Sequence, residues 1–164
     1  MKIKKSSMEE VRVYKYPFQD DNDELEVEIL NPTAPIPHSY YGHSENCHIA
    51  KWHTTPQKTT KFIEWLEETT NSKVSGIWGV WYHDGGGITW HSHSAEDNLK
   101  YSFVYYVKVP EGSSSIHFNS DPSKPGDTIL PVEQGLCAVW SNHLPHCVPP
   151  SNHKGRCVLA GNLM

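Results

Sequence analysis

Residues 76–109 read GIWGVWYHDGGGITWHSHSAEDNLKYSFVYYVKV, and this stretch decides the class of fold. Three runs rich in Val, Ile, Trp, Tyr and Phe follow one another here. A triple glycine at 85–87 separates the first two runs, and a polar segment separates the last two. Short β-branched and aromatic runs between turn residues are typical of strands. The stretch therefore predicts strands at residues 77–83, 88–93 and 102–109.

Strand-like segments recur along the rest of the chain, separated by Gly- and Pro-rich turns. They are predicted at residues 11–16, 24–30, 115–118, 128–130, 136–140, 147–148 and 156–160. Residues 59–70 have helical spacing instead, with Phe62, Ile63 and Leu66 on one stripe and Thr59 or Thr60 as the expected N-cap. This pattern predicts a mainly β fold, a double-stranded β-helix (jelly roll) of about eight core strands with one flanking helix.

The 164 residues fit one domain, residues 1–164, of which residues 1–7 are expected to be flexible. An apolar fraction of 37%, with six Trp and eight Tyr, argues against disorder. The net charge of −5 is spread along the chain, so no nucleic-acid partner is expected. We also expect no membrane span and no signal peptide, because no apolar run reaches the required length.

Four cysteines stand at positions 47, 137, 147 and 157, and none forms a CxxC pair. This spacing argues against a zinc knuckle. Three of the cysteines lie in or beside predicted strands, where a free cysteine is usually a small buried apolar residue. The interpretation is a reducing, cytoplasmic compartment.

Two histidines stand near the end of the strand predicted over residues 88–93. Residues i and i+2 of a strand point to the same face, so the imidazoles of His91 and His93 aim at one place. This arrangement suits two ligands on a single metal ion. One strand cannot close such a site, and a third ligand must come from elsewhere in the sequence.

His146 is the best candidate for the third ligand, because it lies at another predicted strand–turn junction. His143, three residues earlier, is the competing candidate. Three ligands on one face of a metal leave positions open for substrate and oxygen, as in non-heme iron enzymes. Arg156 follows on the last predicted strand, where alternation places it on the same face as Val158 and Ala160. A guanidinium buried there suits a carboxylate.

Three segments resemble the 2-oxoglutarate- and Fe(II)-dependent oxygenases, in the branch similar to prolyl hydroxylases and their bacterial and phage relatives. The first segment is WHSH at 90–93 followed by FVYYV at 103–107. The second, WSNHLPHCVPP at 140–150, is the most specific, since it is similar to the family's signature around the distal iron ligand. The third, GRCVLAGN at 155–162, resembles the family's last strand. The resemblance covers residues 76–162.

This resemblance implies that His91 and His146 hold the first and distal iron-ligand positions. It implies further that Arg156 binds the far carboxylate of 2-oxoglutarate and that Tyr106 bonds the same carboxylate through its phenol. The implied enzyme is an oxidoreductase, an Fe(II)- and 2-oxoglutarate-dependent dioxygenase. It would hydroxylate a small-molecule or peptide substrate with dioxygen, by oxidative decarboxylation of 2-oxoglutarate. No catalytic residue beyond the metal and co-substrate ligands is implied.

His93 stands where the family is expected to have a carboxylate ligand. A histidine there gives a neutral three-His site, a design also known in cupin-like iron dioxygenases that need no 2-oxoglutarate. Asp97 is the alternative ligand, with Glu96 beside it, if the loop turns back toward the metal. Three other functions stay open: a cupin-like three-His dioxygenase, a non-enzymatic metal- or ligand-binding jelly roll, and a zinc hydrolase or isomerase.

Overall fold

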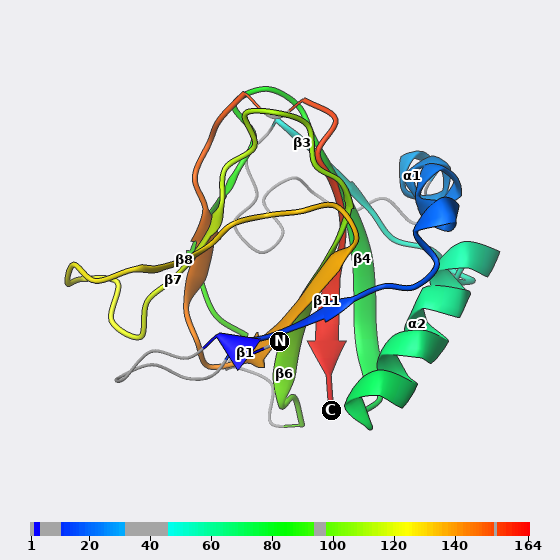
Figure 1. The fold of residues 1–164 in the computed structure, drawn as a ribbon, viewed down its shortest axis with the longest axis horizontal. Coiled ribbons are helices and arrows are strands. Elements are labelled where there is room, and N and C mark those ends of the chain that lie inside the picture. The colour runs from blue at the N-terminus through cyan, green and yellow to red at the C-terminus, as the bar shows by residue number, and fades with distance from the viewer. Residues whose placement is uncertain (1, 4–10, 32–45, 94–97, 153) are drawn as a thin grey trace.

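Two antiparallel sheets face each other in the computed structural model, which describes residues 2–3, 11–31, 46–93, 98–152 and 154–164 (Figure 1). The larger sheet contains, in spatial order, β1 (Lys2–Ile3), β2 (Val11–Lys15), β9 (Leu136–Ser141), β6 (Tyr101–Lys108), β11 (Cys157–Leu163), β4 (Val74–Tyr82) and β3 (Cys47–Ala50). The smaller sheet contains β5 (Ile88–His91), β10 (His146–Val148), β7 (Ile116–Phe118) and β8 (Thr128–Leu130).

The strands from β4 to β11 wind back and forth between the two sheets. β4, β6, β9 and β11 pair in the larger sheet, while β5, β7, β8 and β10 make up the smaller one. This alternation is the double-stranded β-helix that the run of short strands predicts, so the jelly roll is confirmed. β1, β2 and β3 extend the larger sheet at its two edges, and β3 is a strand that the sequence analysis did not predict.

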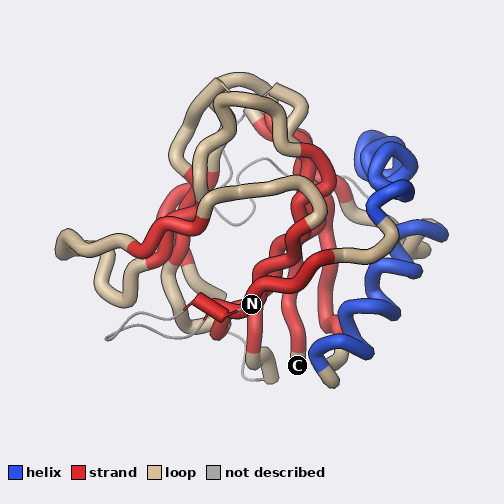
Figure 2. The backbone as a smooth tube through the Cα atoms, in the orientation of Figure 1, coloured by secondary structure: helices blue, strands red, loops and turns tan. Residues whose placement is uncertain are grey.

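Two apolar layers result, because side chains on each strand of the larger sheet alternate between its faces. On β6, Val104 and Tyr106 belong to the core between the sheets, whereas Phe103 and Tyr105 belong to the core under the helices. The tube in Figure 2 shows the helices lying against one face of the larger sheet and the smaller sheet facing the other. The inner core therefore carries the side chains that can form a site.

The predicted helix at residues 59–70 is confirmed as α2 (Gln57–Thr70), which buries Phe62 and Leu66 against the sheet. Its predicted cap is wrong. The helix starts after Pro56, and Thr59 lies inside the first turn. The carboxylate of Glu28 instead accepts hydrogen bonds from the backbone N–H groups of Lys58, at 2.9 Å, and Thr59, at 2.8 Å. A carboxylate from another helix thus takes the place of the N-cap side chain.

The strand predicted at residues 24–30 is wrong, because this segment forms the helix α1 (Asn22–Leu30), preceded by the short 3-10 helix η1 (Gln19–Asp21). Of the alternating apolar residues, only the pair four residues apart fits one face of a helix, and Val27 between them is exposed. Leu25 and Ile29, four residues apart, are fully buried against the larger sheet. Gly79 on β4 admits Ile29, whose Cγ1 would lie 2.6 Å from any Cβ at that position. The sheet is therefore flanked by two helices among the described residues.

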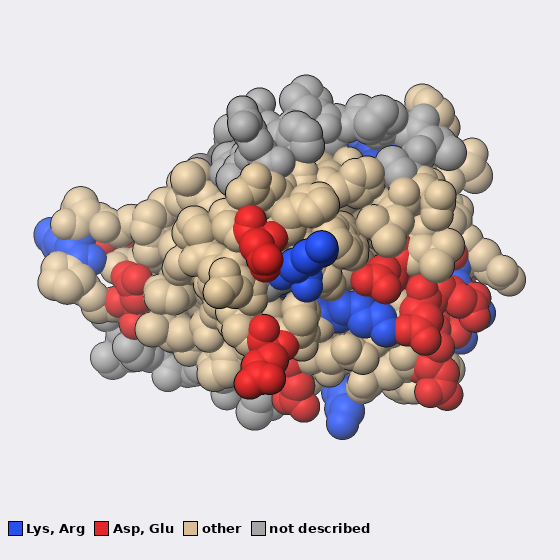
Figure 3. Space-filling view, turned by 90° about the horizontal axis from the view of Figure 1, so that it is seen from above, with Lys and Arg blue, Asp and Glu red and all other residues tan. Residues whose placement is uncertain are grey.

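Ion pairs link Asp21, the last residue of η1, to the first turns of α2. Asp21 forms ion pairs with Lys58, at 3.3 Å, and with Lys61, at 2.8 Å. Figure 3 shows acidic and basic side chains next to one another on the helical side of the molecule.

No helix within the described part of the chain is long and apolar enough to cross a membrane. The four cysteines are buried.

Replacing Glu28 with Ala should lower the free energy of unfolding by about 0.5–2 kcal/mol, the usual cost of a lost N-cap. The substitution removes the acceptor for two backbone N–H groups of α2. Urea denaturation measures the change. Glu24→Ala is the matched control, because Glu24 lies on the same helix and pairs with Lys58 only at the exposed surface, which contributes little. Equal losses in both variants would contradict the capping role.

Candidate metal centre

Three histidines meet between the two sheets. His91 ends β5, His93 follows two residues later, and His146 begins β10. One ring nitrogen from each lies within 4.8 Å of the other two, a separation that fits ligation of one metal ion. His91 and His146 are opposite one another in the antiparallel pair of β5 and β10, and their ring centroids are 4.2 Å apart. The predicted convergence of the three imidazoles is observed.

Each imidazole has an oxygen acceptor at its Nδ1 atom. Nδ1 of His91 lies 2.8 Å from the carbonyl oxygen of Thr89, and Nδ1 of His146 lies 3.1 Å from that of Leu144. Nδ1 of His93 is hydrogen-bonded to Oδ1 of Asn162. Because these oxygens can only accept, each neutral imidazole carries its proton on Nδ1 and keeps a lone pair on Nε2. This is the form in which histidine binds a metal.

The backbone of His93 is attached to the turn that leads to His146. β5 ends at His91, two residues earlier than predicted, so strand pairing does not hold His93. Its N–H donates instead to the carbonyl of Asn142 at 2.8 Å, and the amide of Asn142 donates back to the His93 carbonyl at 3.4 Å. Asn142 is 3% exposed. This reciprocal pair joins the segment of His93 to the turn before His146.

The sequence left His143 and Asp97 as alternatives to the histidines of this cluster. His143 is exposed and does not belong to the histidine cluster, so His146 is the histidine that the turn directs inward. Asp97 and Glu96 lie outside the described residues. Phe118 and Trp140 flank the imidazole of His146, with ring centroids 6.2 Å and 4.8 Å from it, and these contacts restrict its orientation.

Arg156 is buried at the start of β11, with 1% of its surface exposed. This burial agrees with the face predicted from Val158. Its guanidinium lies over the rings of Tyr82, at 5.2 Å, and Tyr106, at 5.5 Å, and donates a hydrogen bond to the carbonyl of Ser114. No carboxylate pairs with it among the described residues. Within the same residues, its Nε and the hydroxyl of Tyr106 have no hydrogen-bond partner.

The two tyrosines stay protonated beside this cation. Burial raises the pKa of Tyr106 to about 12, and the nearby Arg156 charge opposes the rise. Burial raises the pKa of Tyr82 as well. Both phenols are therefore neutral hydrogen-bond donors near pH 7. Tyr105 points the opposite way and donates to Asn22, so Tyr106 is the member of the pair that faces the inner core.

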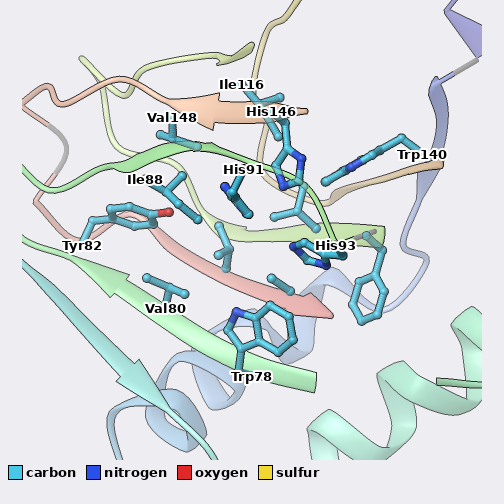
Figure 4. A pocket seen from close by; sticks show the side chains of 14 residues that line it. Trp78, Val80, Tyr82, Ile88, His91, His93, Ile116, Trp140, His146 and Val148 are labelled. Atoms are coloured by element: carbon cyan, nitrogen blue, oxygen red, sulfur yellow. The ribbon is translucent and has the colours of Figure 1, made fainter. Parts of the chain in front are cut away.

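A pocket between the sheets is lined by the three histidines and Tyr82, whereas Arg156 and Tyr106 are not among its lining residues (Figure 4). The three imidazoles lie along one part of its wall, and Tyr82 points its hydroxyl into it from β4. Apolar side chains supply most of the remaining wall, among them Trp78, Val80, Ile88, Ile116, Trp140 and Val148. Tyr82 was not among the site residues predicted from the sequence. The alternation of Trp78, Val80 and Tyr82 along one strand was the signal that marked it as inward-facing.

Replacing His146 with Ala should abolish stoichiometric binding of Fe(II) or Co(II), because two imidazoles do not enclose a metal ion. His143→Ala is the matched control, three residues away on the same turn, and should bind one equivalent as the wild type does. Isothermal titration calorimetry on the metal-free protein gives the stoichiometry. Retained binding in His146→Ala, or loss of binding in His143→Ala, would reverse the assignment.

No family model and no curated protein matches the chain by sequence. Among solved structures, it is similar to a Pseudomonas putida prolyl-4-hydroxylase, with a TM-score of 0.66 and 14% identity over 93% of this chain and 91% of that one. It is also similar to an oxidoreductase of the 2OG-Fe(II) oxygenase family from Burkholderia pseudomallei, with a TM-score of 0.69 and 7% identity over 93% and 83%.

A third similar structure is the viral collagen prolyl hydroxylase of Paramecium bursaria Chlorella virus-1 in its complex with 2OG. Its TM-score is 0.65, with 14% identity over 93% of this chain and 94% of that one. Sequence identities this low establish a shared fold, while function must be argued from the site itself. The chain therefore has the jelly-roll fold of the 2OG-Fe(II) oxygenases, as the three sequence segments led us to expect.

Proposed function

We propose that this protein is an Fe(II)- and 2-oxoglutarate-dependent oxygenase that hydroxylates a small-molecule or peptide substrate. The observation that carries the proposal is the buried arginine beside β11 of the larger sheet, which lies between the same two sheets as the three histidines. Arg156 is 1% exposed and has no carboxylate partner among the described residues. A buried guanidinium is costly unless an anion satisfies it, and a dicarboxylate reaching from a metal would do so.

His91, His93 and His146 are the proposed metal ligands. Their arrangement fits an iron ion because three imidazole nitrogens on one side leave the other coordination positions open for a chelating co-substrate and dioxygen. The hydrogen bonds at their Nδ1 atoms keep the Nε2 lone pairs available. When bound, Fe(II) and 2-oxoglutarate supply the oxidation: dioxygen is consumed, the co-substrate is decarboxylated to succinate, and a hydroxyl group reaches the substrate.

Arg156 and Tyr106 are the proposed partners of the far carboxylate. The planar guanidinium can bond a carboxylate through two N–H groups, and the neutral phenol can donate a third hydrogen bond. Each has one polar atom without a partner among the described residues, so a carboxylate would satisfy both. Tyr82 lies on the other side of the guanidinium and limits its movement. The protein thus positions the co-substrate from the end opposite the metal.

The apolar wall of the pocket has a separate role. Trp78, Ile88, Trp140 and Val148 leave few groups that could hold water beside the metal, which protects the oxidation from side reactions. Two of the similar structures are prolyl hydroxylases, one of them for collagen. Peptides containing proline are therefore the first substrate class to assay, followed by small molecules.

A three-His dioxygenase without 2-oxoglutarate is the second candidate. The observation that favours it is His93, a neutral ligand at the position where the oxygenase resemblance expects a carboxylate. In this alternative Arg156 would bind a carboxylate of the substrate itself. The two functions differ in one measurable respect, which is whether the metal-loaded protein binds and consumes 2-oxoglutarate.

Metal-loaded wild type should bind 2-oxoglutarate saturably, and Arg156→Lys should weaken that binding by about 1–3 kcal/mol, or about 5- to 150-fold. The lysine keeps the charge but loses the two parallel N–H donors. Anaerobic calorimetric titration measures the affinity. Arg12→Lys is the matched control, because the guanidinium of Arg12 on β2 lies over the ring of Tyr101, which packs against the core under the helices, on the other face of the larger sheet.

Two outcomes would count against this account. Absence of saturable binding to the metal-loaded wild type would exclude the 2-oxoglutarate-dependent reaction and leave the three-His dioxygenase or the non-enzymatic metal- or ligand-binding jelly roll. Equal affinities in wild type and Arg156→Lys would show that another group holds the carboxylate. Formation of succinate from 2-oxoglutarate under air, with Fe(II) and ascorbate, gives an independent check on turnover.

A further inference from the structure

The hydrogen-bond acceptor at Nδ1 of His93 is of a different kind from the acceptors at the other two histidines. For His91 and His146, the acceptor is a backbone carbonyl two residues earlier in the chain, from Thr89 and Leu144. No substitution can remove a backbone carbonyl. For His93, the acceptor is the side-chain oxygen of Asn162, 69 residues away. The second ligand position therefore depends on a side chain that this chain has placed there.

Asn162 and Ser102 form a small polar floor beneath His93. The two residues are opposite one another in the pairing of β11 with β6. The side-chain oxygen Oδ1 of Asn162 accepts the Nδ1–H of His93. The hydroxyl oxygen of Ser102 lies 3.1 Å from the same Nδ1 atom. Ser102 is 0% exposed and Asn162 is 4% exposed. Neighbouring inward-facing positions on these strands are apolar, namely Val104 and Ala160.

Burying two polar side chains in an apolar core is costly unless they have hydrogen-bond partners. Here the side-chain oxygen Oδ1 of Asn162 has the Nδ1–H group of His93 as its hydrogen-bond partner. A neutral imidazole carries one N–H, so an acceptor at Nδ1 leaves the lone pair on Nε2. The polar floor thus suits a histidine that binds a metal through Nε2, in a place where β5 no longer supplies a carbonyl.

We propose that Asn162, with Ser102, is the positioning residue that makes His93 a neutral metal ligand through Nε2. The second ligand position is then built for a histidine, with its own supporting hydrogen bonds, and is not a carboxylate site that has lost its acid. This inference rests on the proposed metal centre. Partners of this kind fix the tautomer and the ring orientation of a ligand and strengthen its bond to the metal.

The test compares wild type with Asn162→Leu and Asn162→Asp. Leucine has a similar size but no acceptor, so Co(II) affinity should fall by about 10- to 100-fold. Aspartate keeps an oxygen acceptor at the same place, so Co(II) affinity should equal or exceed that of wild type. NMR of the imidazole nitrogens in the metal-free, histidine-labelled protein gives a second readout. The His93 proton should lie on Nδ1 in wild type and Asn162→Asp, and should lose that preference in Asn162→Leu.

Tyr105→Phe is the matched control for loss of stability. It deletes a buried hydrogen bond, from the Tyr105 hydroxyl to Asn22 at 2.6 Å, on the opposite face of β6. It should lower the stability of the fold and leave Co(II) affinity unchanged. If Asn162→Leu does not fold, Asn162→Asp and Ser102→Ala decide: the first should keep wild-type affinity, and the second should bind Co(II) more weakly.

The inference is overturned if Asn162→Leu binds Co(II) as tightly as wild type with the His93 proton still on Nδ1. It is also overturned if Asn162→Asp binds Co(II) tenfold more weakly than wild type. If Asn162→Leu does not fold, Co(II) binding by Ser102→Ala as tight as that of wild type overturns it as well. These results leave the metal centre itself intact, because wild type still binds the ion. A wild type that binds no Co(II) removes the metal centre and this inference together.

Discussion

The pairing of β10 with β5 is the interaction on which the centre of the molecule depends. It places His146 directly opposite His91, and the register shifts between His146 and Val148. Such an irregularity bends a strand and re-aims its side chains, and it is common beside active sites. The close approach of the two segments also requires Gly87, where a Cβ would lie 2.7 Å from the carbonyl oxygen of Val148. A weaker pairing here would separate the first ligand from the third.

Charge is the second constraint on the site. Three neutral imidazoles would leave the charge of a divalent metal uncompensated, and Arg156 adds a positive charge between the same two sheets. An apolar pocket between the sheets screens these charges far less than water does. An anionic ligand that reaches both centres would satisfy them together. The combination of neutral ligands with a buried arginine therefore suits binding of a dianion.

The strands could be predicted from the sequence because a run of β-branched and aromatic residues between turn residues is a local pattern. The runs at residues 76–109 have β-branched and aromatic residues between turns, and they became β4, β5 and β6. Residues 24–30 were mistaken for a strand because Leu25, Val27 and Ile29 alternate with the period of a strand, whereas in the helix only Leu25 and Ile29 are buried and Val27 is exposed. Tertiary packing of Ile29 against Gly79 decides for the helix, and sequence spacing does not reveal that contact.

The site was predictable where a ligand stands near a strand end. His91, His93 and His146 lie together and Arg156 is buried, as expected, although β5 ends before His93; their roles in binding stay predictions. Their supporting residues were not predicted, because Asn162 and Asn142 act across 69 and 49 positions of sequence. Such contacts arise from sheet order and turn geometry, which a single sequence does not show.

The most direct test of the account is a crystal structure of the protein grown with Mn(II), as an unreactive substitute for Fe(II), and 2-oxoglutarate. The account predicts one metal ion bound to Nε2 of His91, His93 and His146 at about 2 Å. It predicts further that 2-oxoglutarate chelates this ion and extends its far carboxylate to Arg156 and Tyr106. A metal ion held by other residues, or a bound 2-oxoglutarate that does not contact Arg156, would contradict it.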